Sequence, residues 1–201
     1  MSARKPRAKR RASRPAIEHR LSPLRVALVT GMPAAGKEEF VRAARRFRLR
    51  IVRMGDIVRE EARRRGLPLT DSAVGGMAHQ ERVEHGFGIW AERTLPRLRG
   101  RRILVDGLRG KAELDVFRRE FGDRLVVFAV HASPEARYTR ALKRNRSDDV
   151  ATRAAFRARD ERELGWGLGE VLATADVMVL NEGTLAEFRR AVASALGRIY
   201  G

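Results

Sequence analysis

A glycine-bounded turn that ends in lysine is the clearest chemical signal in this chain. The stretch "GMPAAGK" follows the apolar run "RVALVT" and precedes a helical pattern. It has the spacing G-x-x-x-x-G-K, in which the glycines let the backbone curl around phosphate and the lysine reaches the β- and γ-phosphates. The amides of residues 34–38 and the helix dipole would then face the anion. The spacing predicts a phosphate-binding loop formed by Gly31, Met32, Pro33, Ala34, Ala35, Gly36 and Lys37.

The residues after the lysine depart from this pattern. A hydroxyl that binds Mg²⁺ normally follows, whereas this chain has Glu38 and Glu39. Three interpretations stay open: one of the glutamates supplies a carboxylate ligand, Asp106 and phosphate oxygens suffice, or catalysis is weakened. Acids beside phosphates are unfavourable unless a metal or arginine offsets them. The loop therefore supports nucleotide binding better than it supports turnover.

An acid that ends an apolar run is the second signal. In "RILVDG", residues 102–107, Asp106 follows the run directly. Beside a phosphate loop this is a Walker B arrangement, in which the carboxylate holds Mg²⁺ directly or through water. The other interpretation is a capping or turn aspartate. Arg109 lies at the same place, where it would suit a phosphate.

Two further turns carry polar residues. In "MGDIVR", residues 54–59, Asp56 and Arg59 are three apart and share a helical face that could point at an anion. Alternatively, Asp56 is a plain helix N-cap. Asn181 and Gly183 belong to a turn of the kind that contacts the base in nucleotide sites.

The positions of these turns follow from the elements between them. Apolar runs cover residues 25–30, 50–54, 102–107, 124–130 and 176–181, and helical patterns follow each one. Runs without alternation suit strands buried on both faces, and strand–helix alternation favours a parallel sheet. Ligands bind at the carboxyl ends of such strands. We predict one α/β domain over residues 23–201, a three-layer sandwich of the P-loop NTPase type, after a disordered basic tail at 1–22.

Composition limits the class of protein. The 201 residues contain no cysteine, which excludes disulfides and thiolate metal sites, and the four histidines have no metal-ligand spacing. No apolar run approaches the ~20 residues of a membrane span, and the basic N-terminus lacks the apolar part of a secretory signal. We therefore expect a cytoplasmic protein without a membrane partner. The sequence says nothing decisive about oligomeric state.

The charge is strongly basic. Of the net +18, residues 1–20 account for +7 through eight Lys/Arg and one Glu. Such a balance suggests an anionic ligand, nucleic acid or both. The alternative is an arginine-rich solvated surface. For residues 1–22 two interpretations remain open: non-specific contact with nucleic acid, or an extension without function.

Together these motifs resemble the adenylate kinase-like nucleoside monophosphate kinases. "GMPAAGK" parallels their glycine-rich loop, "MGDIVR" their G-D-x-x-R motif, "DGLR" a shortened D-G-x-P-R motif, and "RSDD" their lid hinge. The resemblance covers about residues 24–199. It implies a five-stranded sheet in the order 2-3-1-4-5, an acceptor-binding insert at about 55–99 and a short lid at about 144–168. In that family the loop reads G-K-G-T, so the glutamates replace both hydroxyl positions.

A closer match is an archaeal group of adenylate kinase-related proteins, described as nucleotide or dephospho-CoA kinases. The stretches "HASPEAR", "RDERELGWGLGEV" and "NEGTLAEF" look like that group's signatures. The resemblance implies an enzyme that uses ATP and Mg²⁺ to phosphorylate an AMP-like nucleotide first, or dephospho-CoA second.

The resemblance also implies residue roles. Lys37 and the loop would hold ATP, and Asp106, with Glu38 or Glu39, would hold Mg²⁺. The acceptor would meet Met54, Gly55, Asp56, Arg59, Arg82, Gly107 and Arg109. Lid and hinge candidates are Arg140, Arg144, Arg146, Arg159 and Arg162, which would contact transferring phosphates unless the segment is only a charged surface helix.

Two other functions compete with this one. The paired glutamates favour an ATPase or nucleotide-dependent switch without an acceptor, although Arg59 and Arg109 would then have no purpose. The basic tail favours a factor that couples ATP binding to RNA. We carry all three forward.

Overall fold

The computed structural model describes residues 25–144 and 152–201. One parallel sheet has the strand order β2-β3-β1-β4-β5. The strands are β1 (Arg25–Thr30), β2 (Arg50–Arg53), β3 (Arg102–Asp106), β4 (Leu125–His131) and β5 (Val177–Leu180). The predicted fold is therefore confirmed, and the predicted strand ends differ from the observed ones by at most one residue. The predictions for residues 1–24 and 145–151, including the tail and Arg146, concern residues outside the described ranges.

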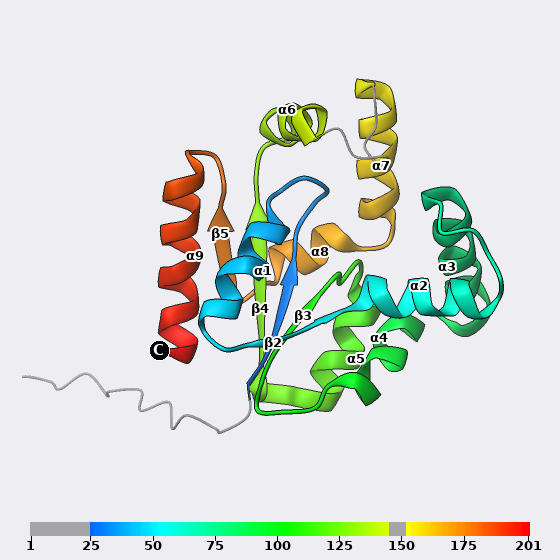
Figure 1. Cartoon of the computed structure of the whole chain (residues 1–201), viewed down its shortest axis with the longest axis horizontal. Helices are drawn as coiled ribbons and strands as arrows, with labels where there is room; N and C mark the ends of the chain where they lie inside the picture. The colour runs from blue at the N-terminus through cyan, green and yellow to red at the C-terminus, as the bar shows by residue number, and fades with distance from the viewer. Residues whose placement is uncertain (1–24, 145–151) are drawn as a thin grey trace, which may run out of the picture.

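Helices cover both faces of the sheet (Figure 1). One face carries α1 (Lys37–Arg46) and α9 (Leu185–Tyr200). The other carries α2 (Met54–Arg64), α3 (Asp71–His85), α4 (Ile89–Thr94), α5 (Lys111–Phe121) and α8 (Leu168–Ala173). Beyond the carboxyl ends of the strands lie α6 (Pro134–Arg144) and α7 (Arg153–Gly165). Short 3₁₀ turns cover Leu95–Arg97 and Gly122–Arg124.

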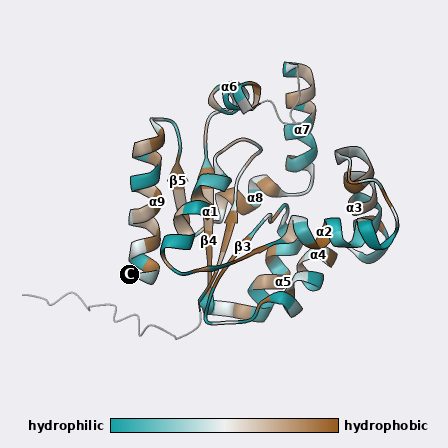
Figure 2. Ribbon diagram, viewed as in Figure 1, coloured by the Kyte–Doolittle hydropathy of each residue, from teal (hydrophilic) through white to brown (hydrophobic). Residues whose placement is uncertain are grey.

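The central strands are buried on both faces, which explains their unbroken apolar runs. In β1, Val26 and Leu28 enter one apolar cluster, and Ala27 and Val29 enter the cluster on the opposite face. In Figure 2 the strands are largely brown, while the surrounding helices alternate between brown and teal. Within the described ranges, no helix has the length and apolarity needed to cross a membrane.

The start of α2 corrects one expectation. The helix begins at Met54, and Arg53 is its N-cap. Asp56 therefore lies inside the first turn and does not cap the helix. An acid in that turn still interacts favourably with the helix dipole.

Candidate active site

The turn from Gly31 to Lys37 connects β1 to α1 at the carboxyl edge of the sheet. It packs so closely that side chains are excluded at two positions. A Cβ at Gly31 would collide with the carbonyl oxygen of Val130 in β4. Gly36 has φ 115°, and a Cβ there would collide with the amide nitrogen of Asn181. Both glycines are thus required by close approach, one to β4 and one to the turn after β5.

Backbone strain is present at the centre of this turn. Ala34 has φ 61°, a left-handed conformation that costs an L-residue roughly 1 kcal/mol or more. Two side chains from distant segments hold the turn in place. Asn181 Nδ2 donates to the carbonyl of Ala35 at 2.8 Å, and Arg137 Nη1 donates to the carbonyl of Pro33 at 3.2 Å. The loop is therefore fixed before any ligand binds.

Lys37 folds back over this loop. Its Nζ donates to the carbonyls of Gly31 and Met32, the latter at 3.0 Å. Burial and, second, the positive charge of Arg109 lower the pKa of Lys37 to about 8, against the opposing effect of Glu163 and Asp106. A phosphate at the loop would favour the charged ammonium.

Four charged groups surround Lys37 closely enough to affect its pKa, namely Asp106, Arg109, Arg159 and Glu163. Arg109 forms an ion pair with Glu163 of α7, which is 3% exposed. Burial alone would raise the pKa of Glu163, but Arg109, Lys37 and Arg159 lower it overall. Glu163 Oε2 is buried without a hydrogen-bond partner among the described residues. The site thus gathers three cations, Lys37, Arg109 and Arg159, and one buried carboxylate oxygen there has no hydrogen-bond partner among the described residues.

Asp106 ends β3 at the same edge. Its pKa is raised by burial, with a smaller contribution from the charge of Glu38, while Lys37 and Arg53 oppose the rise. Arg53, the register partner of Asp106 on β2, forms an ion pair with Glu38 at 3.0 Å. The sequence analysis did not identify Arg53; its position at the end of the second strand was the available signal.

The two neighbouring glutamates point in different directions. Glu38 lies toward Arg53 and Asp106. Both reach Arg42, Glu38 at 4.0 Å and Glu39 at 2.6 Å, but Glu39 also pairs with Arg189 of α9 at 2.8 Å. Only Glu38 therefore adds an acid to the Asp106 edge.

The structure places some of the residues predicted for the acceptor site next to one another. A Cβ on Gly107 would lie 3.4 Å from the Cβ of Met54 and 3.6 Å from the amide nitrogen of Gly55, so the turns after β2 and β3 are in contact. Asp56 and Arg59 form an exposed ion pair at 3.0 Å. Arg109 follows in the same turn, two residues after Gly107.

Arg82 has a different environment. It is 7% exposed, pairs with Glu113 at 2.9 Å and lies 4.9 Å above the ring of Trp166. Its guanidinium therefore connects α3 to α5 and to the turn before α8. Arg82 and Arg109 line one small cavity of about 10 Å³, which is room for one water.

Arg137 ends the signature stretch "HASPEAR" but was not among the predicted site residues. Its side chain is 4% exposed and forms a bidentate pair with Asp160 of α7, at 2.8 and 2.6 Å. It also donates to the carbonyls of Pro33 and Ala132, and its guanidinium lies 5.1 Å from the ring of Phe156. One side chain thus connects the phosphate loop to α7, which also carries Arg159 and Glu163. The available signal was an arginine one turn into the helix after β4.

The arginines predicted for the lid differ in burial and in their contacts. Arg159 is half-buried beside Lys37, whereas Arg162 is exposed. Arg140 donates to the carbonyl of Asn181 at 2.6 Å. It lines an open pocket of about 430 Å³ along α6, next to the turn that holds Gly183. The side chain of Arg144 lies outside what the structure describes.

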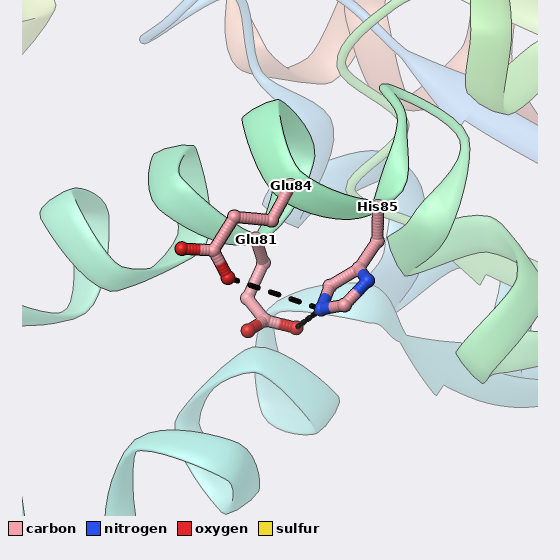
Figure 3. A group of neighbouring side chains, drawn as sticks. All are labelled: Glu81, Glu84 and His85. Carbon is pink, nitrogen blue, oxygen red and sulfur yellow. Dashed lines mark ion pairs between the residues drawn. The ribbon is translucent and has the colours of Figure 1, made fainter.

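One carboxylate–histidine group lies away from this edge. Glu81, Glu84 and His85 on α3 bring ligand-type atoms within 4.8 Å of one another (Figure 3). However, Glu81 is 1% exposed and forms ion pairs with both Arg65 and Arg93. A metal there would have to displace two guanidinium groups, so this cluster is better explained as a structural ion-pair network.

The fold is that of P-loop kinases. A gluconokinase from Sinorhizobium meliloti superimposes with a TM-score of 0.57 and 18% identity, covering 89% of this chain and 94% of its own. A shikimate kinase from Acinetobacter baumannii, solved in complex with shikimate, gives 0.58 and 16% identity, covering 88% and 93%. At these identities the likeness concerns the fold.

Sequence comparison defines the family. The AAA_17 family, described as an AAA domain, matches residues 30–156. A UPF0200 protein from Pyrococcus horikoshii is 39% identical over 180 residues, which is 87% of this chain and 97% of the relative. Another from Thermoplasma acidophilum is 44% identical over 162 residues, covering 80% and 89%. The chain therefore belongs to the UPF0200 family, whose relatives are archaeal as the sequence resemblance predicted.

The lowered pKa of Lys37 gives a prediction about pH. An unfolded lysine has a pKa of roughly 10.4, so between pH 8 and 10 the unfolded chain binds more protons and wild-type stability should rise with pH. The stability of wild type relative to Lys37→Met should rise across that range in urea denaturation. Lys111→Met is the control, since the Asp115 hydrogen bond raises the pKa of Lys111. A flat difference for Lys37 would contradict the assignment.

The Arg137–Asp160 pair should be a principal anchor of α7. Arg137→Ala should lower the free energy of unfolding by about 3 kcal/mol, because it leaves a largely buried carboxylate unpaired. Arg153→Ala is a matched control, since its bidentate pair with Glu135 also joins α7 to α6 but is exposed and should contribute little to stability. Hydrogen exchange of residues 153–165 should accelerate more in the first variant. Equal acceleration in both would argue against the anchor.

Proposed function

We propose that this protein is an ATP-dependent phosphotransferase that moves the γ-phosphate to a nucleotide-like acceptor. AMP or another nucleoside monophosphate is the first choice and dephospho-CoA the second. One observation carries the proposal: Lys37, Arg109 and Arg159 converge beside Asp106 at the mouth of a preformed phosphate loop. Phosphoryl transfer depends on positioning and charge neutralisation, which such a cluster supplies.

The donor side uses the loop and the open pocket. At the start of α1 the amides of Glu39 and Phe40 donate to the Gly36 carbonyl, and Gly36 provides no side-chain cap. The helix N-terminus that precedes them would suit the phosphates of ATP. Lys37 would exchange its carbonyl partners for phosphate oxygens. The adenine would lie between α6 and the turn at Asn181–Gly183, against Arg140.

The oxygen ligands at the end of β3 fit Mg²⁺. Asp106 is a partly buried carboxylate whose pKa is raised by burial, and the charge of Glu38 adds to the rise. A divalent cation would relieve that repulsion, and hard oxygen donors suit it. We assign Asp106 and Glu38 to the metal and leave Glu39 as a residue that secures α1 to α9. Bound there, Mg²⁺ would neutralise charge on the β- and γ-phosphates.

On the acceptor side, two arginines must change partners. Arg59 now pairs with Asp56, and Arg109 pairs with Glu163. An acceptor phosphate would replace the carboxylate on Arg109, since guanidinium binds both groups in the same bidentate manner. Arg159 and Lys37 would then neutralise the transferring group. We assign Arg82 a structural role next to this edge and no contact with the phosphate, because its guanidinium pairs with Glu113.

An ATPase or nucleotide-dependent switch remains the second candidate. The observation in its favour is that both acceptor arginines are already neutralised by acids of this chain. In that case, nucleotide binding would release Glu163 from Arg109 and change the position of α7 without an acceptor.

A product assay separates these candidates. Purified protein would be incubated with ATP and Mg²⁺, separately with AMP, CMP, UMP, dephospho-CoA and no acceptor. Gluconate and shikimate complete the set, because the structural neighbours are a gluconokinase and a shikimate kinase. We expect transfer to an adenylate-containing acceptor and a loss of at least ~100-fold in Lys37→Ala, since each charge-stabilising donor contributes about that factor. Equal ADP formation in every tube would instead support the ATPase.

The glutamates can be tested separately in the same assay. Glu38→Gln should raise the Mg²⁺ concentration needed for half-maximal rate, because it removes a carboxylate from the metal edge. Glu39→Gln is the matched control and should leave that concentration unchanged, since its carboxylate faces Arg42 and Arg189. Identical Mg²⁺ curves for both variants and wild type would remove Glu38 from the metal site.

A further inference from the structure

The amino edge of the sheet, opposite the phosphate loop, carries a row of arginines. Because all strands are parallel, they begin at this same edge (Figure 1). Three strands start with arginine and the fourth is preceded by one. In sheet order these are Arg50 of β2, Arg102 of β3, Arg25 of β1 and Arg124 before β4. Neighbouring strands are ~4.8 Å apart, so the row runs across four adjacent strands.

The loops at this edge extend the row. The helix α1 ends with Arg45 and Arg46, and Arg48 follows; Arg99 and Arg101 lead into β3. Backbone contacts hold these segments together: Arg50 Nη1 donates to the carbonyl of Arg99 at 2.8 Å, and the Arg25 amide donates to that of Arg101 at 3.3 Å. We call this group the arginine edge; it comprises Arg25, Arg45, Arg46, Arg48, Arg50, Arg99, Arg101, Arg102 and Arg124.

The arginine edge differs from the active-site edge in its pairing. At the active-site edge, Arg53, Arg59, Arg109 and Arg137 each form an ion pair with an acid. Among the described residues, no member of the arginine edge does so, and all except the half-buried Arg25 are exposed. Complementing the dipole at the end of α1 accounts for Arg45 and Arg46. Arg102 and Arg124 also donate to carbonyls at the ends of α1 and α5, but these contacts leave both charges without a partner acid among the described residues.

We propose that the arginine edge binds the phosphate backbone of a nucleic acid, a function separate from phosphotransfer. Clustered guanidinium groups repel one another, and a polyanion offsets that repulsion while releasing its counterions. Guanidinium also binds phosphate oxygens in a bidentate manner. The chain joins this edge at Arg25 from residues 1–24, whose sequence contains eight Lys/Arg and one Glu.

The absence of exposed apolar side chains at the edge argues for nucleic acid over a lipid surface. In the described part of the chain, the exposed large apolar residues lie elsewhere: Leu69, Val83, Phe87, Leu142, Leu164, Met178, Leu180 and Leu185. Interfacial membrane binding combines basic residues with apolar ones that enter the acyl boundary. Figure 2 shows the lower ends of the strands in teal.

Binding of a fluorescein-labelled 20-nucleotide single-stranded RNA to the full chain tests the proposal. The variant Arg48→Gln/Arg101→Gln/Arg102→Gln removes three charges from the edge. The control, Arg63→Gln/Arg157→Gln/Arg190→Gln, removes three exposed charges elsewhere that form no ion pair among the described residues. We expect the edge variant to weaken binding at least ~10-fold and to lower the slope of log K against log salt by about 2, which corresponds to three lost phosphate contacts. The control should retain the wild-type slope.

Three outcomes would overturn the proposal. The first is equal weakening in both variants, which would reflect net charge alone. The second is capture of wild type by phosphatidylserine vesicles without RNA binding. The third is loss of affinity on deletion of residues 1–22 together with wild-type affinity in the edge variant. Thermal unfolding would verify that both variants fold, and Arg101→Glu provides a single substitution at the same edge. These readouts do not depend on ATP turnover.

Discussion

The rest of the site depends on the hydrogen bonds and close contacts that hold the backbone of the turn from Gly31 to Lys37. This turn contains a left-handed alanine and two glycines in close contact with neighbouring backbone or side chains. It is held by Arg137 on one side and Asn181 on the other. Because the carbonyls of Pro33 and Ala35 are bound in this way, the turn keeps its curved shape up to the start of α1. The position of Lys37 follows from that arrangement.

Arg137 joins two parts of the site. It connects the phosphate loop to Asp160 on α7, and α7 in turn presents Arg159 and Glu163 toward Lys37. A shift of the loop on nucleotide binding would therefore be transmitted to the helix that carries the lid charges. The ion pair between Arg109 and Glu163 also joins α7 to the turn after β3. The phosphate loop, α7 and the end of β3 are thus connected through a few charged side chains.

The charged side chains at the two edges of the sheet are arranged differently. At the carboxyl edge, Arg53, Arg59, Arg109 and Arg137 are paired with acids, whereas Lys37 and Arg140 donate to backbone carbonyls. At the amino edge, arginines stand without acids of their own chain among the described residues. The net charge of +18 therefore includes groups at two opposite edges of the sheet.

The sequence by itself determined the fold and the location of the site. Runs of apolar residues specify buried strands, and the turn at Gly31–Lys37 and the acid at Asp106 mark the strand ends. These signals are local, because backbone conformation and strand burial depend on neighbouring residues. Only the tertiary structure decided which charged side chains meet. Glu38 and Glu39 are adjacent in sequence, yet one faces Arg53 and the other Arg189. Arg82 is buried against Glu113, and Arg137 reaches Pro33 across the sheet edge. Ion pairs join residues far apart in the chain, and their geometry follows from packing, which no local pattern encodes.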